Sequence, residues 1–134
     1  MKDPKMKEIW LVSLPVIEED SKNGFIYFSV QERACLVIDE GKNFIVNRNF
    51  DYLGLKVTSK SRSNRREIKD SQKKGLRYKS YIRNETPIKI EREQFIHKIC
   101  KLDTDEFLLH MNDLVNFFNL DNLQKIKNKE LVTI

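Results

Sequence analysis

The sequence predicts an α+β protein, in which a small β-barrel-like or partner-completed sheet precedes a C-terminal three-helix element of the helix-turn-helix or winged-helix kind. Three observations lead to this class: β-rich runs fill the first 58 residues, a basic stretch follows, and helical periodicity dominates the last third. The 134 residues therefore divide into three predicted segments. These are a β-rich protein-binding module (1–58), a basic linker or arm (59–88) and a helical module (89–134).

The N-terminal segment consists of short β-rich runs separated by turn residues. "KEIWLVSLP" ends at Pro15, "GFIYFSVQ" is aromatic and β-branched, and "ACLVIDE" leads through Gly41-Lys42-Asn43 to "FIVNR", a pattern typical of a β-hairpin. "FDYLGLKVTSK" alternates as one more strand. Four or five such strands cannot bury both faces as one flat sheet, which predicts a small barrel or a sheet completed by a partner.

The last third of the chain predicts three helices. Four apolar residues of "EREQFIHKICKL" fall on one helical face: Phe95, Ile96, Ile99 and Leu102. "DTDE", from Asp103, has the form of a capping box with Asp in place of Ser or Thr, and a second helix follows it to Phe118. "NLQKIKNK" predicts a short third helix. These dimensions match a helix-turn-helix, although a plain helical interaction bundle has the same pattern.

Positive charge is concentrated in about one fifth of the chain. Residues 56–83 hold eleven Lys or Arg and two acidic residues, a balance of +9, whereas the whole chain has a net charge of +5. The rest of the chain is therefore mildly acidic, at −4. Such a block usually meets a polyanion, because each neutralised phosphate releases condensed counterions. The alternative is a solvated, disordered linker.

The basic segment is predicted to be a flexible polycation that binds phosphate without reading sequence, with Tyr78 and Tyr81 close enough to stack on exposed bases. Lysines of the last predicted helix would add a weak DNA contact. The predicted nucleic-acid-binding residues are Lys60, Arg62, Arg65, Arg66, Lys69, Lys73, Lys74, Arg77, Lys79, Arg83, Lys125, Lys127 and Lys129. The predicted partner-binding residues are Trp10, Val12, Phe25 and Tyr27.

Catalysis finds little support in the sequence. Neither His97 nor His110 has a second His or Cys at i+4 for a metal, and Cys35 and Cys100 lack a third group that would complete a nucleophilic site. We therefore predict no enzyme, cofactor, metal or small-molecule substrate. No apolar stretch approaches the roughly 20 residues that a membrane span needs. Two cysteines outside any C-x-x-C pair favour a reducing compartment, nuclear or cytoplasmic.

Two stretches carry a resemblance to a known family. "IWLVSLP", Ile9 to Pro15, resembles the tryptophan-containing opening strand of the small (beta) subunit of general transcription factor IIF. "EQFIHKICKLDTDEFLLHMNDLVNFFNLDNLQKIKNKELV" is similar to the winged-helix end of the same subunit, and a basic connector separates the two stretches. The resemblance implies N-terminal strands that pair with a larger partner on RNA polymerase, and C-terminal helices that touch promoter DNA.

We therefore expect a non-enzymatic accessory subunit of a transcription complex associated with RNA polymerase. Its β-rich N-terminus would bind a larger protein subunit or the polymerase, and its basic linker (59–88) and C-terminal helices would bind DNA or RNA. Two alternatives stay open. One is a protein-only interaction module, a scaffold or inhibitor that docks on an acidic partner. The other is a ribosome-binding or structured-RNA-binding protein.

Overall fold

Strand pairing organises the described part of the chain, residues 3–41 and 51–118 of a computed structural model. Among these residues six strands form an antiparallel sheet in the order β4-β3-β2-β1-β6, and β5 pairs with the edge of β3 that faces away from β2. Their bounds are β1 (Glu8–Glu19), β2 (Ile26–Asp39), β3 (Tyr52–Thr58), β4 (Tyr81–Ile82), β5 (Ile88–Ile90) and β6 (Phe95–Lys101). A 3-10 turn, η1 (Arg92–Gln94), precedes β6, and the helix α1 (Thr104–Phe117) follows it.

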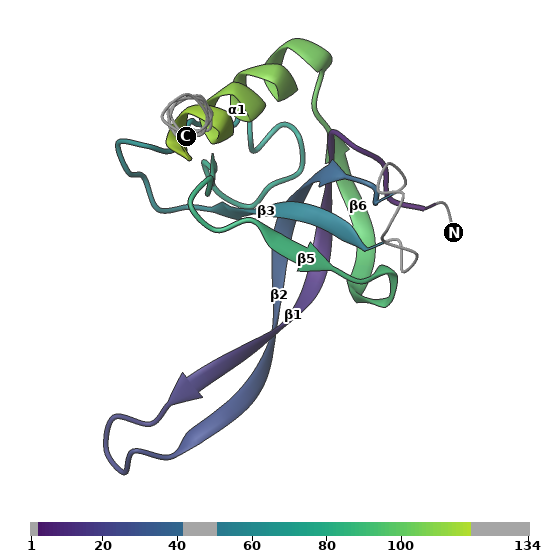
Figure 1. Ribbon diagram of the computed structural model, residues 1–134. Helices are drawn as coiled ribbons and strands as arrows, with labels where there is room; N and C mark the ends of the chain where they lie inside the picture. The colour runs from purple at the N-terminus through teal and green to yellow at the C-terminus, as the bar shows by residue number, and fades with distance from the viewer. Residues whose placement is uncertain (1–2, 42–50, 119–134) are drawn as a thin grey trace, which may run out of the picture.

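The two longest strands, β1 and β2, project well beyond the sheet. They pair without a register shift from Ile9 opposite Leu36 to Glu19 opposite Ile26. β6 pairs with β1 only as far as Val12, and β3 pairs with β2 only from Cys35 onward. Residues 13–34 form a hairpin, which we call the arm, whose root at Leu14 and Ala34 packs on the core and whose remainder leaves the body (Figure 1).

The sequence predicts two strands, "GFIYFSVQ" and "ACLVIDE", where the structure has the single strand β2. The polar residues Gln31, Glu32 and Arg33 interrupt the apolar run without forming a turn, because each stays paired with a residue of β1. The predicted hairpin through Gly41 falls mostly on residues 42–50, which lie outside the described residues.

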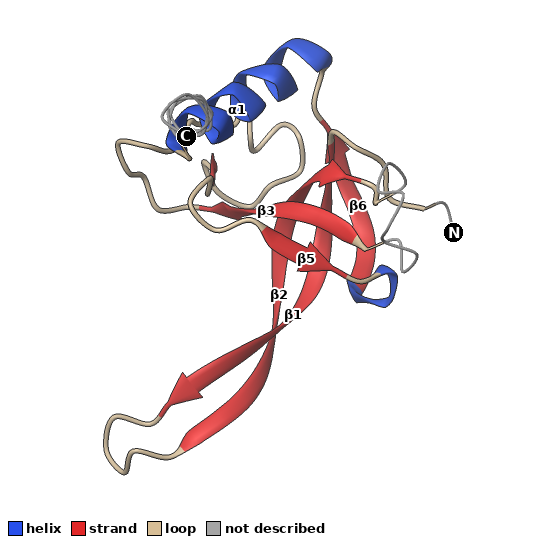
Figure 2. Cartoon of the chain, in the orientation of Figure 1, coloured by secondary structure: helices blue, strands red, loops and turns tan. Residues whose placement is uncertain are grey.

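The sheet buries apolar side chains on both faces. One face is covered by α1 and by the segment after β3, and its core includes Ile9, Leu36 and, from the helix, Phe107. On the other face the sheet curls around a second cluster, in which the ring of Phe95 meets Trp10 and Tyr52 edge to face at centroid distances of 5.7 and 4.9 Å. Figure 2 shows the helix on one side of the curled sheet.

The prediction of a C-terminal three-helix, winged-helix-like element is wrong. Residues Phe95–Lys101, predicted as a helix, form the strand β6, and α1 is the one α-helix within residues 3–41 and 51–118. β6 contains Ile96 and Ile99, whose β-branched side chains favour a strand. Its pairing with β1 passes through two register shifts, which break the strict alternation of a strand and leave an apolar spacing that imitates a helix. The helix predicted in "NLQKIKNK" lies outside the described residues.

The start of the second predicted helix is confirmed. The Asp103 side chain accepts a hydrogen bond from the backbone N–H of Glu106 at 2.8 Å and so caps the first turn of α1. Phe107 packs into the core beneath the helix, and Met111 and Leu114 are partly buried beside it.

The basic segment is folded against the body of the protein. Ile68 and Ile82 are fully buried and Leu76 is 8% exposed, all within the core beneath α1. The backbone N–H of Ile68 donates to Ser80 O at 2.8 Å, and β4 and β5 join the same sheet as β1 to β3. One sheet therefore runs through the predicted segments 1–58, 59–88 and 89–134, and residues 59–83 are not an open linker between two bodies.

Replacing Ile68 with Ala should lower the free energy of unfolding by about 2–5 kcal/mol, because the change leaves a cavity at a fully buried site. Lys73→Ala, at an exposed position of the same segment, is the matched control and should change it by less than about 0.5 kcal/mol. Urea unfolding followed by Trp10 fluorescence measures both. A small effect of Ile68→Ala would contradict the packed arrangement.

Candidate interaction surfaces

The β1–β2 register divides the side chains of the arm between two faces. Directly opposed residues of an antiparallel pair point to the same face, and neighbours along a strand alternate. One face, which we call the apolar face, carries Pro15, Ile17, Ile26, Phe28 and Val30. It continues the sheet face that α1 covers in the body, but no described residue of the helix reaches it (Figure 1).

The apolar face is strongly exposed. Ile17, Ile26, Phe28 and Val30 have exposed fractions between 67% and 77%, and Phe25 in the adjoining turn is 70% exposed. Contiguous apolar patches of more than a few hundred Å² are rare on the surfaces of monomers. Full burial of each such side chain contributes about 1.5–3 kcal/mol. The apolar face is therefore the candidate docking surface of this protein.

The opposite face of the arm is polar and internally hydrogen-bonded. Gln31 Nε2 donates to Glu18 Oε1 at 3.1 Å, and Arg33 Nη2 donates to Gln31 Oε1 at 2.8 Å. The hydrogen bond between Tyr27 and Glu18 raises the pKa of the tyrosine hydroxyl. Glu18, Tyr27, Gln31 and Arg33 are thus joined by hydrogen bonds on this face, which also carries Val16 and Ser29, and the Ser29 hydroxyl has no hydrogen-bond partner among the described residues.

The arm is acidic in a basic protein. Residues 13–34 carry a net charge of −2, whereas the whole chain carries +5. The charged residues of the arm are Glu18, Glu19, Asp20, Glu32, Lys22 and Arg33. A surface that covers the apolar face would therefore match it best with a basic rim.

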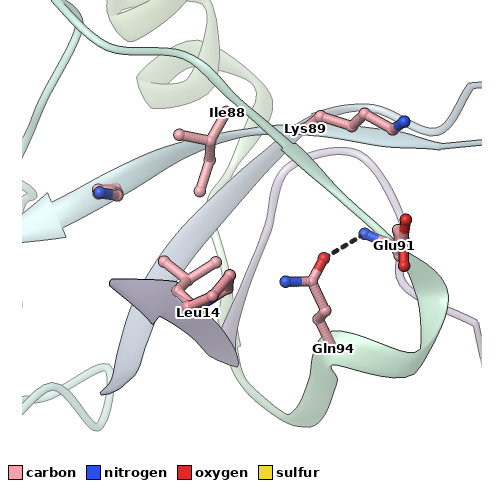
Figure 3. Close-up of a pocket in the computed structure, with 7 residues that line it drawn as sticks. Leu14, Ile88, Lys89, Glu91 and Gln94 are labelled. Carbon is pink, nitrogen blue, oxygen red and sulfur yellow. Dashed lines mark hydrogen bonds between the residues drawn. The ribbon is translucent and has the colours of Figure 1, made fainter. Parts of the chain in front are cut away.

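A hollow of about 400 Å³ lies at the foot of the arm, lined by residues of β1, β3, β5 and η1. Leu14 and Ile88 form its apolar part, and Figure 3 shows Gln94 accepting a hydrogen bond from the Glu91 N–H at 2.7 Å. The other end of the Gln94 amide donates to Ser13 O at 3.1 Å. The Gln94 side chain thus ties η1 to Ser13, at the point where the arm leaves the sheet.

Half of the predicted phosphate-binding residues between 60 and 83 are engaged within the chain. Arg66 pairs with Asp113 at 2.6 Å, on α1, and Lys74 pairs with Glu106 at 3.3 Å on the same helix. The remaining pairs are Arg65 and Arg83 with Glu85, and Lys79 with Glu67. These cations brace the basic segment against the helix and the sheet.

Arg65 is the most deeply placed of these cations, with 3% of its side chain exposed. Its Nε donates to Glu85 Oε1 at 2.9 Å, its Nη2 makes a second bond to the same oxygen, and its Nη1 donates to Lys60 O at 3.0 Å. Burial acts to raise the pKa of Glu85, but the hydrogen bonds from Arg65 and its own backbone, with the charges of Arg65 and Arg83, lower that pKa to about 2.

Five of the predicted cations are exposed, and their charged groups make no ion pair within residues 3–41 and 51–118. They are Lys60, Arg62, Lys69, Lys73 and Arg77. The guanidinium of Arg77 lies 5.4 Å from the ring centroid of Tyr78, which is itself 55% exposed. Tyr81 is only partly exposed, as part of β4. Lys125, Lys127 and Lys129 lie outside the described residues.

The predicted partner-binding residues separate into two pairs. Trp10 is 3% exposed and Val12 is fully buried, so both belong to the core inside the curl of the sheet. Phe25 and Tyr27 are 70% and 48% exposed on the arm. Trp10 Nε1 donates to Glu8 Oε1 at 3.0 Å, which satisfies its polar group internally.

The main residues of the apolar face were not among the residues predicted from the sequence; they are Ile17, Ile26, Phe28 and Val30. The run "FIYF" is continuously apolar and is typical of a strand buried on both faces. The signal that would have found the apolar face is the pairing of "PVIEE" against "IYFSV" in an antiparallel register, which puts Ile17 opposite Phe28 and Pro15 opposite Val30.

The histidines and cysteines occupy separate environments. Burial raises the pKa of the Cys35 thiol to about 12, and burial also lowers the pKa of His110, against the opposing effect of Glu106. Within the described residues no group of three His, Cys, Asp or Glu side chains could hold a metal ion. No helix in residues 3–41 and 51–118 has the length and apolar character to span a membrane.

A scan against protein-family models matches none of them, and a search of curated proteins finds no match. The resemblance to the small subunit of transcription factor IIF therefore stays a prediction from the quoted stretches.

The Arg65–Glu85 pair predicts a pH dependence of stability. Glu85 has a pKa of about 2 in the folded protein and an ordinary value of 4.5. The pair therefore stabilises the fold fully above about pH 4.5, and this contribution is lost as the pH falls toward 2. Allowing for solvent screening, the loss should be about 1–2 kcal/mol.

Unfolding of the wild type and of Glu85→Gln between pH 6 and pH 3 measures this contribution. Glu85→Gln should be less stable than the wild type at pH 6, and the difference between their free energies of unfolding should become smaller as the pH falls. Glu67→Gln, which alters the exposed pair with Lys79, should follow the wild-type curve. A gap that is unchanged at low pH would contradict the assignment.

Proposed function

We propose that this chain is a non-enzymatic docking protein, an accessory subunit that binds a protein partner with the apolar face of its arm. The observation that carries the proposal is the exposure of Ile17, Ile26, Phe28 and Val30 on one side of a ribbon whose other side is polar. The arm is acidic, and so the partner surface is apolar at its centre and basic at its rim.

The physics of two-stranded ribbons supports this proposal. A hairpin without a third strand or a covering element is marginally stable in water, and it gains stability when its apolar side is covered. Aromatic residues near the centre of an interface tend to dominate its affinity. Phe28 lies midway along the apolar face and is 77% exposed, so it is the expected anchor.

The resemblance of residues 9–15 to the opening strand of the small subunit of transcription factor IIF supports a transcription complex as the setting, whereas the second quoted stretch forms β6 and α1 and gives no winged-helix support. In that setting the partner is a larger subunit or RNA polymerase itself. This part of the proposal rests on that sequence stretch alone and is independent of the arm.

The double variant Ile17→Ser, Phe28→Ser should lose the protein that co-purifies with the native chain. Removing two anchors of about 1.5–3 kcal/mol each weakens binding by a hundredfold or more. Native purification with quantitative mass spectrometry measures the stoichiometry, and Ser29→Ala, Gln31→Ala on the polar face is the matched control. Retention of the same protein by both variants would contradict docking through the apolar face.

Nucleic-acid binding is a second candidate function, which the five open cations favour. Lys60, Arg62, Lys69, Lys73 and Arg77 are exposed without an ion pair in the described part of the chain, and Tyr78 offers an exposed ring for stacking. A protein-only docking module is the rival. The other five basic residues of this segment favour the rival, because acidic groups of the same chain already hold them.

If all five open cations contact phosphate, affinity for duplex DNA or RNA should fall several hundredfold between 50 and 200 mM salt, about 0.9 in log–log slope for each contact. Lys69→Ala, Lys73→Ala should reduce that slope by about two. Lys79→Ala, which removes an internally paired cation, is the control. Fluorescence anisotropy measures all three proteins, and a flat salt dependence would favour the protein-only rival.

A further inference from the structure

The outer edge of β2 is unpaired over the whole length of the arm. Residues 26–34 pair with β1 on one side, and no other strand among the described residues pairs with them. These nine residues, "IYFSVQERA", contain no Pro, Lys or bulge, and the charged residues that could protect the edge are Glu32 and Arg33, both near its root. The corresponding edge of β1 contains Pro15, which has no N–H to offer.

The hydrogen-bonding direction along this edge follows from a contact in the body. Val37 O accepts the Lys7 N–H at 3.0 Å, and Phe25 O accepts the Asp20 N–H at 2.8 Å, so the odd-numbered residues of β2 direct their backbone groups toward the β1 side. Backbone direction alternates along a strand, and the β1–β2 register has no shift. The even-numbered residues, including Phe28, Val30 and Glu32, therefore direct their N–H and C=O groups outward.

We propose that a second copy of this chain pairs with this edge, β2 against β2 in an antiparallel register centred on Val30. Residue 30 is the midpoint of 26–34, so this register pairs all nine unpaired residues at once. The even-numbered residues then face each other and exchange two N–H···O bonds per opposed pair. The two hairpins become one four-stranded sheet, which is the size that a free-standing ribbon lacks.

The side chains suit this register. Each Tyr27 lies opposite an Arg33 of the other copy, which allows a cation–π contact, and the two Val30 side chains meet at the centre. No like charges face each other across the new pairing. A register centred on Glu32 instead would oppose two carboxylates.

Opposite charges at the two ends of each arm also favour antiparallel pairing of two copies. Antiparallel pairing brings the turn of each arm, with Glu19 and Asp20, toward the foot of the other arm. There β3 carries Lys56, which pairs with Cys35 of β2, and Lys60 follows that strand. The contact is the same on both copies, so the assembly closes as a two-fold dimer.

The dimer uses the edge of the arm, whereas the proposed function uses its apolar face. The two are separable, and the dimer does not rest on docking. Pairing of the arms would place two apolar faces side by side and so double the surface that a partner covers.

The decisive experiment uses the residue that meets its own copy at the symmetry axis. Val30→Lys and Val30→Glu each oppose like charges and should weaken the dimer by about tenfold or more, while an equimolar mixture of the two should restore dimers. Position 30 is 71% exposed, so neither change disturbs the core. Ile17→Lys, 67% exposed on the same face but on β1, is the control and should stay dimeric. Sedimentation velocity of the purified full chain reports each state.

A wild-type chain that stays monomeric at high concentration would overturn the proposal, and so would Val30→Lys remaining as dimeric as the wild type. Two variants distinguish a failure of the dimer proposal from a failure of the proposed docking function. Glu32→Pro removes an outward N–H and leaves the four main residues of the apolar face unchanged, so it should abolish the dimer and retain the co-purifying protein. Ile17→Lys should stay dimeric and should lose the co-purifying protein.

Discussion

The structure depends on the uninterrupted pairing of β1 with β2. This register sends Ile9 and Leu36 to the face beneath α1, and it sends Trp10 and Cys35 into the curl of the sheet. A slip of one residue would exchange the two sets, because strand side chains alternate with a period of two. The same register continues past the last contact with β6, and it is what separates an apolar from a polar side in the arm.

The basic segment shows how a strongly charged stretch can be structural. Its apolar residues, Ile68 among them, enter the core, and half of its predicted phosphate-binding cations meet carboxylates that sheet and helix hold in place. Arg65 is the extreme case, since a guanidinium that is 3% exposed requires Glu85 and the carbonyl of Lys60 to offset its desolvation. The remaining open cations are therefore an interrupted patch, and their spacing is fixed by the fold.

The sequence predicted the parts of this fold that local signals determine. β3 follows from alternation, and the capped start of α1 follows from Asp103, three positions before Glu106. The start of β1 follows from its β-rich run, but its predicted end at Pro15 is wrong, because Pro15 stays paired with Val30 and the strand continues to Glu19. β6 did not follow, because its apolar spacing is set by bulges against a strand more than 80 residues away in sequence. The apolar face of the arm was equally inaccessible: Ile17 and Phe28 share a face only once their strands are registered. The pairing of Arg66 with Asp113 likewise depends on the docking of α1, which no local pattern encodes.

The bonds from Gln94 to Ser13 and Glu91 have a mechanical consequence. The Gln94–Ser13 bond fastens the root of the ribbon to η1, and beyond it only β1–β2 pairing holds the ribbon among the described residues. A strand rises about 3.3 Å per residue, and the five residues from Pro15 to Glu19 therefore hold the tip on the order of 15 Å away from its root. Ile26, near the tip, therefore stands clear of the described side chains of the body, which accounts for its exposed fraction of 68%.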